Sequence, residues 1–440
     1  MEAETDNFTT RKMFFYLLLY KIVIEMIYIY GISKLYGYSG LTLNLNYLSY
    51  GISIIYLLFI AIIAPKDKTK PSTYLFITVE VFLFVPLISY YWLNNKSYIY
   101  ASYVLLSLII ISLIVRIKPV PINIKDTTAQ IWIKFIFVFY VIFTVYLFIK
   151  RGGIDTRAFN FDLIYDLRSE NKIQGILGYI MNWCTKAYFP FFFLYFFYKK
   201  KYSMLFFVIM FQLLMYLSFG NKAFLFSIGV VVLTTYIMKK NNYLKGITLS
   251  IIGLNILSYI LKAFNISDVL YRAIPYRMIF IPSQIQYQYF DFFKKGEKVL
   301  FADGIIGKIL AIDSPYPDPI PLLISKYYLG SEAYANSGMF ADAYANGGGI
   351  LVVIIAIIFG IILYLIDSTT MNVPTYIVVG SSSYIMFVLN DTGLQTTLFT
   401  GGLGALMILL LLLNSSYTSH RKKEESIETG NIFRMGLKKS

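Results

Sequence analysis

Runs of apolar residues, each long enough for a membrane-spanning helix, recur along the whole chain and are separated by short polar stretches. A helix needs about 20 mostly apolar residues to cross the hydrocarbon core of a bilayer. The pattern therefore predicts an all-α, polytopic integral membrane protein with about twelve transmembrane helices. The expected spans are residues 13–32, 46–64, 72–92, 99–115, 131–149, 176–198, 203–219, 222–238, 246–263, 349–366, 374–390 and 397–413.

The composition supports the same class. Hydrophobic residues make up 58% of the 440 residues, charged residues make up 14%, and the mean hydropathy is +0.64. Soluble proteins carry about 25% charged residues, so the composition excludes a soluble globular enzyme and a disordered chain. The net charge of +15 does not indicate nucleic-acid binding, because basic residues of membrane proteins mark the cytoplasmic face. We expect a lipid bilayer as the partner, and no nucleic acid.

Cysteine and histidine are nearly absent. The single cysteine, Cys184, lies in an apolar run, so an intrachain disulfide is impossible. The single histidine, His420, lies in the polar C-terminal tail. A Cys/His metal site and a mechanism that uses a buried imidazole are therefore excluded, and we expect neither a metal nor a cofactor.

The loop charges predict the orientation. If the N-terminus is cytoplasmic, the outer short loops hold only Lys34, Lys96 and Lys222. The inner loops then hold Arg11, Lys12, Lys66, Lys68, Lys70, Arg116, Lys118, Lys125, Lys199, Lys200, Lys201, Lys239, Lys240 and Lys245. Cytoplasmic loops are the ones enriched in Lys and Arg. The sequence therefore predicts a single transmembrane helical domain over residues 1–440 with both termini cytoplasmic, including a tail at 414–440.

The first extracytoplasmic loop, residues 150–175, departs from this charge rule. It carries Lys150, Arg151, Arg157, Arg168 and Lys172 on the outer face, which suggests a bound anion. At about 3.6 residues per turn, Arg157, Arg168 and Lys172 would share one face of an amphipathic helix over 157–170. There they could bind a phosphate or pyrophosphate through bidentate contacts. The alternative is an interfacial helix whose cations reach lipid headgroups or pair with nearby acids.

The second and larger extracytoplasmic loop, residues 264–348, mixes arginine with aromatic residues. Arg272 and Arg277 flank Pro275, which is expected to bend or end a helix. The nearby aromatic residues are Tyr271, Tyr276, Tyr287, Tyr289, Phe290 and Phe292. Such a surface suits a phosphate and a sugar ring. The alternative is packing against neighbouring helices and an aromatic belt at the membrane interface.

The end of this loop collects hydrogen-bonding groups. Glu332, Asn336, Asp342 and Asn346 are of the kind that contact sugar hydroxyls, and either acid could serve as a general base. Gly347, Gly348 and Gly349 permit close backbone approach. The alternative is a capped helix entry. Elsewhere, Lys222 could reach into an outward-facing cavity or be an interface lysine, and Lys21 and Glu25 are expected to form a structural pair.

Four stretches carry a resemblance to a known family. They are GGIDTRAFNFDLIYDLR (152–168), the Gly220-Asn221-Lys222 junction, YRMIFIPSQIQYQYFDFF (276–293), and NSGMFADAYANGGG (336–349) before a long apolar helix. Together with the predicted spans, the chain resembles the Wzy-type oligosaccharide repeat-unit polymerases of bacterial O-antigen and capsule assembly.

The resemblance implies a membrane glycosyltransferase in the bacterial cytoplasmic (inner) membrane. Such an enzyme joins undecaprenyl-pyrophosphate-linked oligosaccharide units into long polysaccharide at the outer face, without a cofactor and with a chain-length regulator protein as partner. Arg168, Arg277 and Asp342 are the expected catalytic residues. The expected substrate-binding residues are Arg157, Arg272, Lys172, Lys222, Tyr276, Asn336, Tyr344 and Asn346.

Two other functions remain open from the sequence. An O-antigen ligase also has about twelve spans and a large outer loop, but that family is thought to use a histidine in the loop, and this chain has none there. A flippase for lipid-linked oligosaccharide would suit the span count. Flippases usually keep their loops short, so the long segment 264–348 argues against this function.

Overall fold

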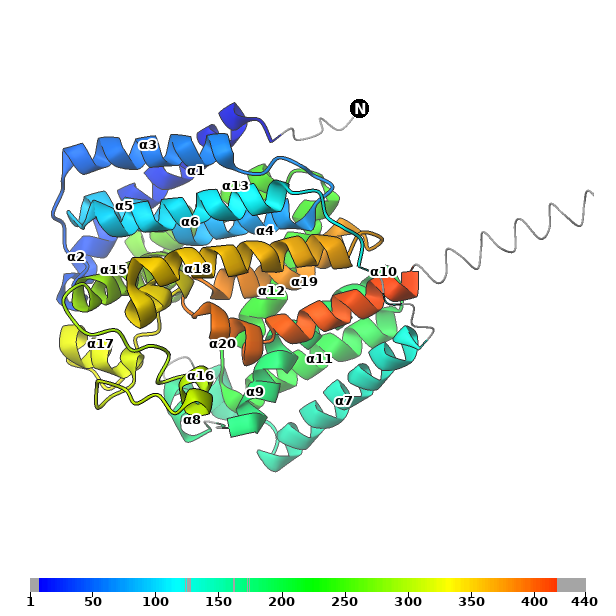
Figure 1. Ribbon diagram of the computed structural model, residues 1–440. Coiled ribbons are helices and arrows are strands. Elements are labelled where there is room, and N and C mark those ends of the chain that lie inside the picture. The colour runs from blue at the N-terminus through cyan, green and yellow to red at the C-terminus, as the bar shows by residue number, and fades with distance from the viewer. Residues whose placement is uncertain are drawn as a thin grey trace, which may run out of the picture. The chain divides into compact units, whose positions relative to one another are not determined.

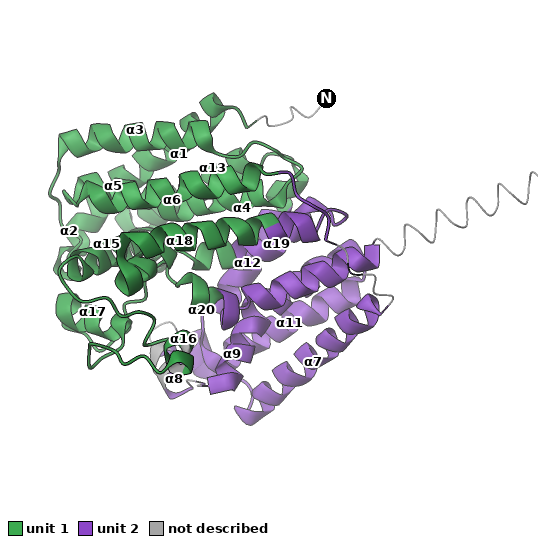
Figure 2. Ribbon diagram, in the orientation of Figure 1, with its two compact units in different colours: residues 1–117, 236–364, 385–397 green, residues 118–235, 365–384, 398–440 purple. Residues whose placement is uncertain are grey.

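The computed structural model describes residues 8–122, 124, 128–160, 163–171, 173 and 175–417. Within these residues the secondary structure is entirely helical, with no strand. The chain divides into two compact units, each built from several separate stretches of sequence (Figure 2). Unit 1 comprises residues 1–117, 236–364 and 385–397, and unit 2 comprises residues 118–235, 365–384 and 398–440. The predicted sites are therefore divided between two units.

Helices from the N-terminal third and from the centre of the chain build unit 1, where they lie side by side (Figure 1). They are α1 (Thr10–Ile27) with η1 (Tyr28–Ile32) and α2 (Ser33–Leu35); η2 (Gly37–Ser39); α3 (Tyr47–Ile63); α4 (Pro71–Val79) with η3 (Glu80–Phe84) and α5 (Val85–Leu93); α6 (Tyr98–Arg116); α13 (Tyr243–Ala263); α14 (Val269–Tyr271) with η6 (Arg272–Phe280) and α15 (Ile281–Phe293); α16 (Ile305–Leu310); α17 (Ile320–Leu329); and most of α18 (Met339–Thr369). The continuous helix from α4 to α5 is the most deeply buried of the long apolar helices.

Unit 2 contains the helices of the second third of the chain and its C-terminal part. They are α7 (Ala129–Lys150); η4 (Thr156–Phe159); α8 (Ile164–Glu170); α9 (Gly175–Trp183) with η5 (Cys184–Tyr188) and α10 (Phe189–Tyr198); α11 (Tyr202–Phe219); most of α12 (Ala223–Lys239) and α19 (Thr375–Val388); and the helix Leu403–Tyr417. The short α20 (Leu394–Phe399), like α12, α18 and α19, has residues in both units.

Seven helices in the described residues are long and apolar enough to cross a membrane. They are Thr10–Leu35, Pro71–Leu93, Tyr98–Arg116, Ala129–Lys150, Tyr202–Phe219, Tyr243–Ala263 and Met339–Thr369; shorter apolar helices are Tyr47–Ile63, Ala223–Lys239, Thr375–Val388 and Leu403–Tyr417. The predicted all-helical class with several candidate membrane spans is confirmed. The number of twelve spans stays a prediction.

Contacts between loops assign the helix ends of unit 1 to two groups. Lys66 donates to Thr10 Oγ1, and Lys70 donates to the carbonyls of Val115 and Ile117. A second set of contacts joins Asn46 to Asn95, Lys96 to Asp291 and Gln284 to the Ser39 carbonyl. Loops predicted to be cytoplasmic thus contact one another, as do loops predicted to be outside, which is the expected result for antiparallel spans. Which group faces the cytoplasm stays a prediction.

The expected pair in the first span is confirmed. The Lys21 ammonium donates to the Glu25 carboxylate, and both side chains are buried. Trp92 Nε1 donates to the same carboxylate oxygen at 2.6 Å. The Lys21 ammonium also lies 4.7 Å from the centre of the Tyr50 ring. The pair thus links α1 to α3 and α5, which supports the structural role predicted for it.

The segment predicted as the large outer loop contains a helix that runs through Pro275. The chain is helical from Val269 to Phe293, and the backbone adopts π-helical hydrogen bonding over Arg272–Phe280. Proline removes a backbone donor and crowds the preceding turn, and the wider π-turn accommodates it without ending the helix. Of the two outcomes expected at Pro275, a bend or an end of the helix, the end does not occur. Residues 282–290 are all buried in unit 1.

Candidate functional site

A break in α18 marks the polar end of the longest apolar helix. Gly347 has φ −158° and ψ 21°, and Gly348 has φ 65° and ψ −158°. The second combination is essentially restricted to glycine, which gives this glycine run a conformational role. The turns before the break, residues 339–346, carry Asp342, Tyr344 and Asn346, three of the predicted site residues. We call these three residues together with Lys298 the kink cluster.

Asn346 holds the turn at residues 299–301 against the break. Its side-chain oxygen accepts from Phe301 N at 2.7 Å, and its amide nitrogen donates to the Asp342 carbonyl at 2.8 Å. The backbone adds two bonds, from Val299 N to the Ala345 carbonyl and from Leu300 N to the Asn346 carbonyl, each 3.1 Å long. The buried Asn346 amide therefore has a structural function in the described residues, in addition to the sugar contact predicted for it.

Tyr344 and Lys298 form the second part of the kink cluster. The Tyr344 ring is buried and packs on Phe290 with 4.8 Å between ring centres. The Lys298 ammonium lies 4.8 Å from the centre of the Tyr344 ring and donates to the Phe293 carbonyl. Burial lowers the pKa of Lys298. The sequence analysis missed this lysine, because only the fold brings it from the end of α15 to the break in α18.

Asp342 is half-buried and packs against the backbone of Gly393, which comes from a distant part of unit 1. No ion pair is found for its carboxylate among the described residues. The hydroxyl of the nearby Tyr289 donates to the Ala335 carbonyl at 2.9 Å. Burial raises the pKa of Tyr289, and the carboxylates of Asp342 and Asp303 raise it further. Two acids and a tyrosine hydroxyl thus lie near one another beside the kink.

Three glutamines line the buried part of α15 next to this region. Gln286 accepts from the Tyr100 hydroxyl at 3.0 Å and donates to Asn390 Oδ1 at 3.0 Å. The side-chain oxygens of Gln284 and Gln288 are buried and accept no hydrogen bond within the described part of the protein. Buried polar atoms usually find a partner. The buried part of α15 therefore carries two side-chain oxygens that could still accept a hydrogen bond.

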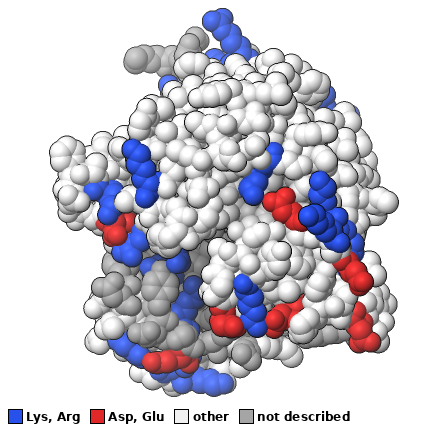
Figure 3. Space-filling model, turned by 90° about the vertical axis from the view of Figure 1, so that its left-hand side faces the viewer, with Lys and Arg blue, Asp and Glu red and all other residues white. Residues whose placement is uncertain are grey.

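The arginines of the second predicted site lie on η6 in the same unit. Arg272 and Arg277 are both exposed, and Arg272 forms an ion pair with Asp268 at 2.9 Å. Tyr276 is half-buried and stacks on Tyr36 with 4.0 Å between ring centres. Of the predicted mixture of guanidinium and aromatic surface, only the exposed arginines and the half-buried Tyr276 are found on η6. The other aromatic residues named for it are mostly buried, as the alternative of packing against neighbouring helices expects; they are Tyr271, Tyr287, Tyr289 and Phe290. Figure 3 shows one face of the molecule, on which basic and acidic side chains lie next to one another in several places and the remaining described surface is mostly uncharged.

The segment 150–175 differs from the prediction. Arg157 lies in the 3₁₀ turn η4, and Arg168 lies in the separate helix α8, with Asn160 in an extended conformation after η4. The expected single helix that aligns Arg157 with Arg168 is therefore wrong. The Asp155 side chain caps the start of η4 by accepting from the Arg157 backbone N–H, and the extended backbone of Asn160 ends η4 before α8 begins.

Arg157 is engaged by carboxylates of its own segment. Its guanidinium contacts Asp155 at 2.8 Å and Glu170 at 2.9 Å. The hydrogen bonds from Arg157 lower the pKa of Asp155 and, in turn, raise the pKa of Arg157. This is the local pairing that the sequence left open as an alternative. Arg168 is exposed and has no ion-pair partner among the described residues.

The other predicted site residues are exposed or lie outside the described residues, and the full set is divided between the two units. Lys222 is exposed, at the junction before α12. Asn336 is exposed, in the non-helical segment before α18. Lys172 and most of the tail at 414–440 lie outside the described residues. Arg157, Arg168 and Lys222 belong to unit 2, whereas Arg272, Tyr276, Arg277, Asn336, Asp342, Tyr344 and Asn346 belong to unit 1.

The chemistry available at the kink cluster is acid–base and electrostatic. A carboxylate can accept a proton, and a partly buried ammonium can stabilise developing negative charge. Within the ranges that the structure describes, no group of three or more His, Cys, Asp or Glu residues is arranged to hold a metal ion. This cluster therefore provides the strongest structural basis for a catalytic assignment.

Comparison with known proteins returned no match to a family model, to a curated protein or to a solved structure.

Proposed function

We propose that this protein is a polymerase that joins undecaprenyl-pyrophosphate-linked oligosaccharide repeat units into long surface polysaccharide at the outer face of a bacterial cytoplasmic membrane. The observation that carries the proposal is the kink cluster, in which the half-buried Asp342 has no ion-pair partner in the described chain and lies at the polar end of a long apolar helix. This is where a membrane-anchored donor would bring its reacting sugar. The exposed arginines of η6, in the same unit, support the binding of pyrophosphate.

In the proposed reaction, a hydroxyl of the acceptor sugar attacks the anomeric carbon of the donor glycan. Asp342 takes the hydroxyl proton, the new glycosidic bond forms, and the bond from the anomeric carbon to the pyrophosphate oxygen breaks. Undecaprenyl pyrophosphate leaves with the bonding electron pair. Negative charge grows on this leaving group, so fixed guanidinium groups stabilise the transition state more than the ground state.

The proposal assigns different roles in pyrophosphate binding to four arginines. Arg277 and Arg168 bind the pyrophosphates in the proposal, and Arg272 and Arg157 assist. The ion pairs of Arg272 with Asp268 and of Arg157 with Asp155 and Glu170 orient these two side chains. Lys172, Lys222, Tyr276, Asn336, Tyr344 and Asn346 complete the proposed substrate-binding set, and a chain-length regulator is the proposed protein partner.

The test is complementation of a deletion strain, with the surface polysaccharide separated on a gel. We expect Arg168→Ala and Arg277→Ala to shorten or abolish the long-chain ladder, because each removes charge stabilisation of the leaving group. Asp342→Asn should abolish it while the protein still accumulates in the membrane. Lys68→Ala, on the predicted cytoplasmic side, is the control and should keep the ladder. Normal ladders from both arginine variants would refute the proposed pyrophosphate site.

The same strain separates the other two functions. A polymerase defect leaves single repeat units on the surface lipid. Full-length polymer retained on the lipid carrier would indicate a ligase instead, and substrate accumulating on the inner leaflet would indicate a flippase.

A further inference from the structure

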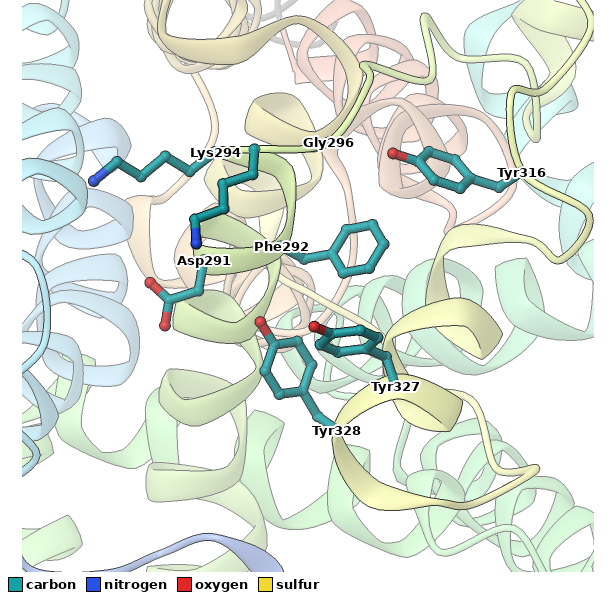
Figure 4. Close-up of a pocket in the computed structure, with 8 residues that line it drawn as sticks. Asp291, Phe292, Lys294, Gly296, Tyr316, Tyr327 and Tyr328 are labelled. Atoms are coloured by element: carbon teal, nitrogen blue, oxygen red, sulfur yellow. The ribbon is translucent and has the colours of Figure 1, made fainter.

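Unit 1 contains a pocket that none of the predicted site residues lines. Its volume is about 610 Å³, and its walls come from the end of α15, the turn after it, the proline-rich segment at residues 314–319 (SPYPDP) and α17 (Figure 4). The lining residues are Asp291, Phe292, Lys294, Lys295, Gly296, Tyr316, Tyr327 and Tyr328. Small-molecule sites in proteins have volumes of roughly 300–1,000 Å³, so the size suits one or two sugar rings.

Aromatic rings form the floor and sides of the pocket. Phe292 contacts Tyr327 with 5.2 Å between ring centres and Tyr316 with 5.7 Å, and Tyr327 contacts Tyr328 with 4.9 Å. The Tyr316 hydroxyl donates to the Glu297 carbonyl at 3.1 Å, which ties the proline-rich segment to the turn after α15. Rings held by one another in this way lose little further conformational freedom when a ligand binds.

Two hydroxyl groups of the pocket are available to a ligand. Tyr327 and Tyr328 lie side by side on α17, and both hydroxyls point toward the end of α15 that carries Asp291 and Phe292 (Figure 4). Neither hydroxyl bonds to another of the described residues. Burial raises the pKa of Tyr328 to about 12, and the Asp291 carboxylate also contributes. The Tyr328 hydroxyl therefore keeps its proton at neutral pH and can donate it in a hydrogen bond.

The charges at the pocket favour an anion. Asp291, at the end of α15, is already held by Lys96, which lies 3.3 Å away in the loop between α5 and α6. Lys294 and Lys295 are exposed, and neither ammonium has an ion-pair partner in the part of the chain that the structure describes. The pocket therefore combines aromatic faces, free hydroxyl groups and two uncompensated positive charges.

We infer that this pocket binds a saccharide that carries a negative charge. The apolar faces of a sugar ring pack on Tyr327 and Phe292, the sugar hydroxyls bond to Tyr327, Tyr328 and Asp291, and a carboxylate or phosphate on the sugar binds Lys294 and Lys295. An uncharged glycan would leave both ammonium groups unused. The inference rests on the proposed function only for the origin of the glycan, which would be the growing chain or its acceptor.

The experiment is a direct binding measurement on the full-length protein in phosphatidylcholine nanodiscs. The probes are tetragalacturonate, which is acidic, and maltotetraose, which is neutral, and calorimetry or saturation-transfer NMR reports binding. We expect tetragalacturonate to bind at least tenfold more tightly than maltotetraose. Tyr327→Ala and the double variant Lys294→Ala/Lys295→Ala should each weaken tetragalacturonate binding by at least tenfold.

Two matched variants serve as controls. Tyr47→Ala and Lys34→Ala remove an exposed tyrosine and an exposed lysine from other parts of unit 1, and both should bind as the unaltered protein does. Absence of tetragalacturonate binding, or equal binding by all pocket variants, overturns the inference. Equal affinity for both probes overturns the assignment of the lysines to an anionic group.

A membrane headgroup is the other source of a phosphate at these lysines. Nanodiscs in which phosphatidylglycerol replaces half of the phosphatidylcholine distinguish the two sources. Unchanged affinity for tetragalacturonate supports a glycan site, whereas loss of affinity shows that lipid headgroups occupy the lysines and overturns the inference. The binding measurement does not depend on polymer formation. If the protein in nanodiscs does not bind tetragalacturonate but supports normal ladders in the complemented strain, only the inference about the pocket is rejected. If the protein binds tetragalacturonate but supports no ladders, only the polymerase proposal is rejected.

Discussion

The carboxylate of Asp342 and the backbone of Gly393 are in direct contact. A Cβ atom built on Gly393 would lie 2.4 Å from Asp342 Oδ2 and 2.7 Å from its carboxyl carbon. Both distances are below any normal contact, so a side chain at position 393 forces the carboxylate to move. Gly393 is close to Asp342 only in the folded protein, because 51 positions separate the two residues along the chain.

This contact predicts a functional effect of Gly393→Ala. The flexible end of Asp342 can turn away at little cost in stability, but the carboxylate then leaves its position in the kink cluster. A misplacement of about 1 Å can lower the rate of an enzyme about 100-fold. We expect a strongly shortened polysaccharide ladder and a nearly unchanged thermal unfolding midpoint in detergent. Gly253→Ala, which has open space around position 253, is the control, and equal ladders from the two variants would contradict the prediction.

Gly348→Ala should act on stability instead. The φ of 65° and ψ of −158° at this position cost a residue with a Cβ atom about 1–3 kcal/mol. The variant should therefore unfold at lower temperature than the Gly253→Ala control in a fluorescence-monitored thermal scan. An unchanged midpoint would mean that the kink in α18 does not need glycine.

The buried Lys21–Glu25 pair supports a third prediction. Lys21→Met leaves the Glu25 carboxylate buried without its ammonium partner, and breaking a buried pair in this way costs about 3–5 kcal/mol. Lys21→Met/Glu25→Gln removes both charges and keeps an acceptor for Trp92. We expect the double variant to be more stable than Lys21→Met, as measured by thermal unfolding and by the yield of folded protein. A double variant less stable than the single one would refute the pairing argument.

The Arg157–Asp155 pair predicts a specific pH dependence. Arg157 lowers the pKa of Asp155 in the folded protein. The pair therefore contributes stability above the ordinary carboxyl pKa of about 3.9, and this contribution is lost as the pH falls through the lowered pKa. The difference in unfolding midpoint between the protein and Asp155→Asn should be constant from about pH 8 to about pH 5 and should shrink only in stronger acid. A difference that disappears near neutral pH would contradict this.

Several features could be predicted because they depend on residues close together in the sequence. The Lys21–Glu25 pair follows from a spacing of four residues on one helix. The close backbone approach expected at the glycine run 347–349 follows from the missing side chain, and it is found at Gly349, where an added Cβ atom would lie 2.6 Å from the Tyr103 ring. The break at Gly347 and Gly348 was not predicted.

Two other local expectations were not met. The extended backbone of Asn160 separates η4 from α8, so no single helix aligns Arg157 with Arg168, and a π-turn carries the helix through Pro275, so the helix does not end there.

The sequence by itself determined the all-helical class and the positions of the apolar helices, because helix length and apolar composition are local properties that a bilayer selects directly. Only the tertiary structure placed Lys298 over Tyr344, Gly393 against Asp342, and the tyrosines of α17 beside the end of α15. Each of these contacts joins residues that are distant along the chain. Their formation depends on how helices pack, which no local pattern of residues encodes.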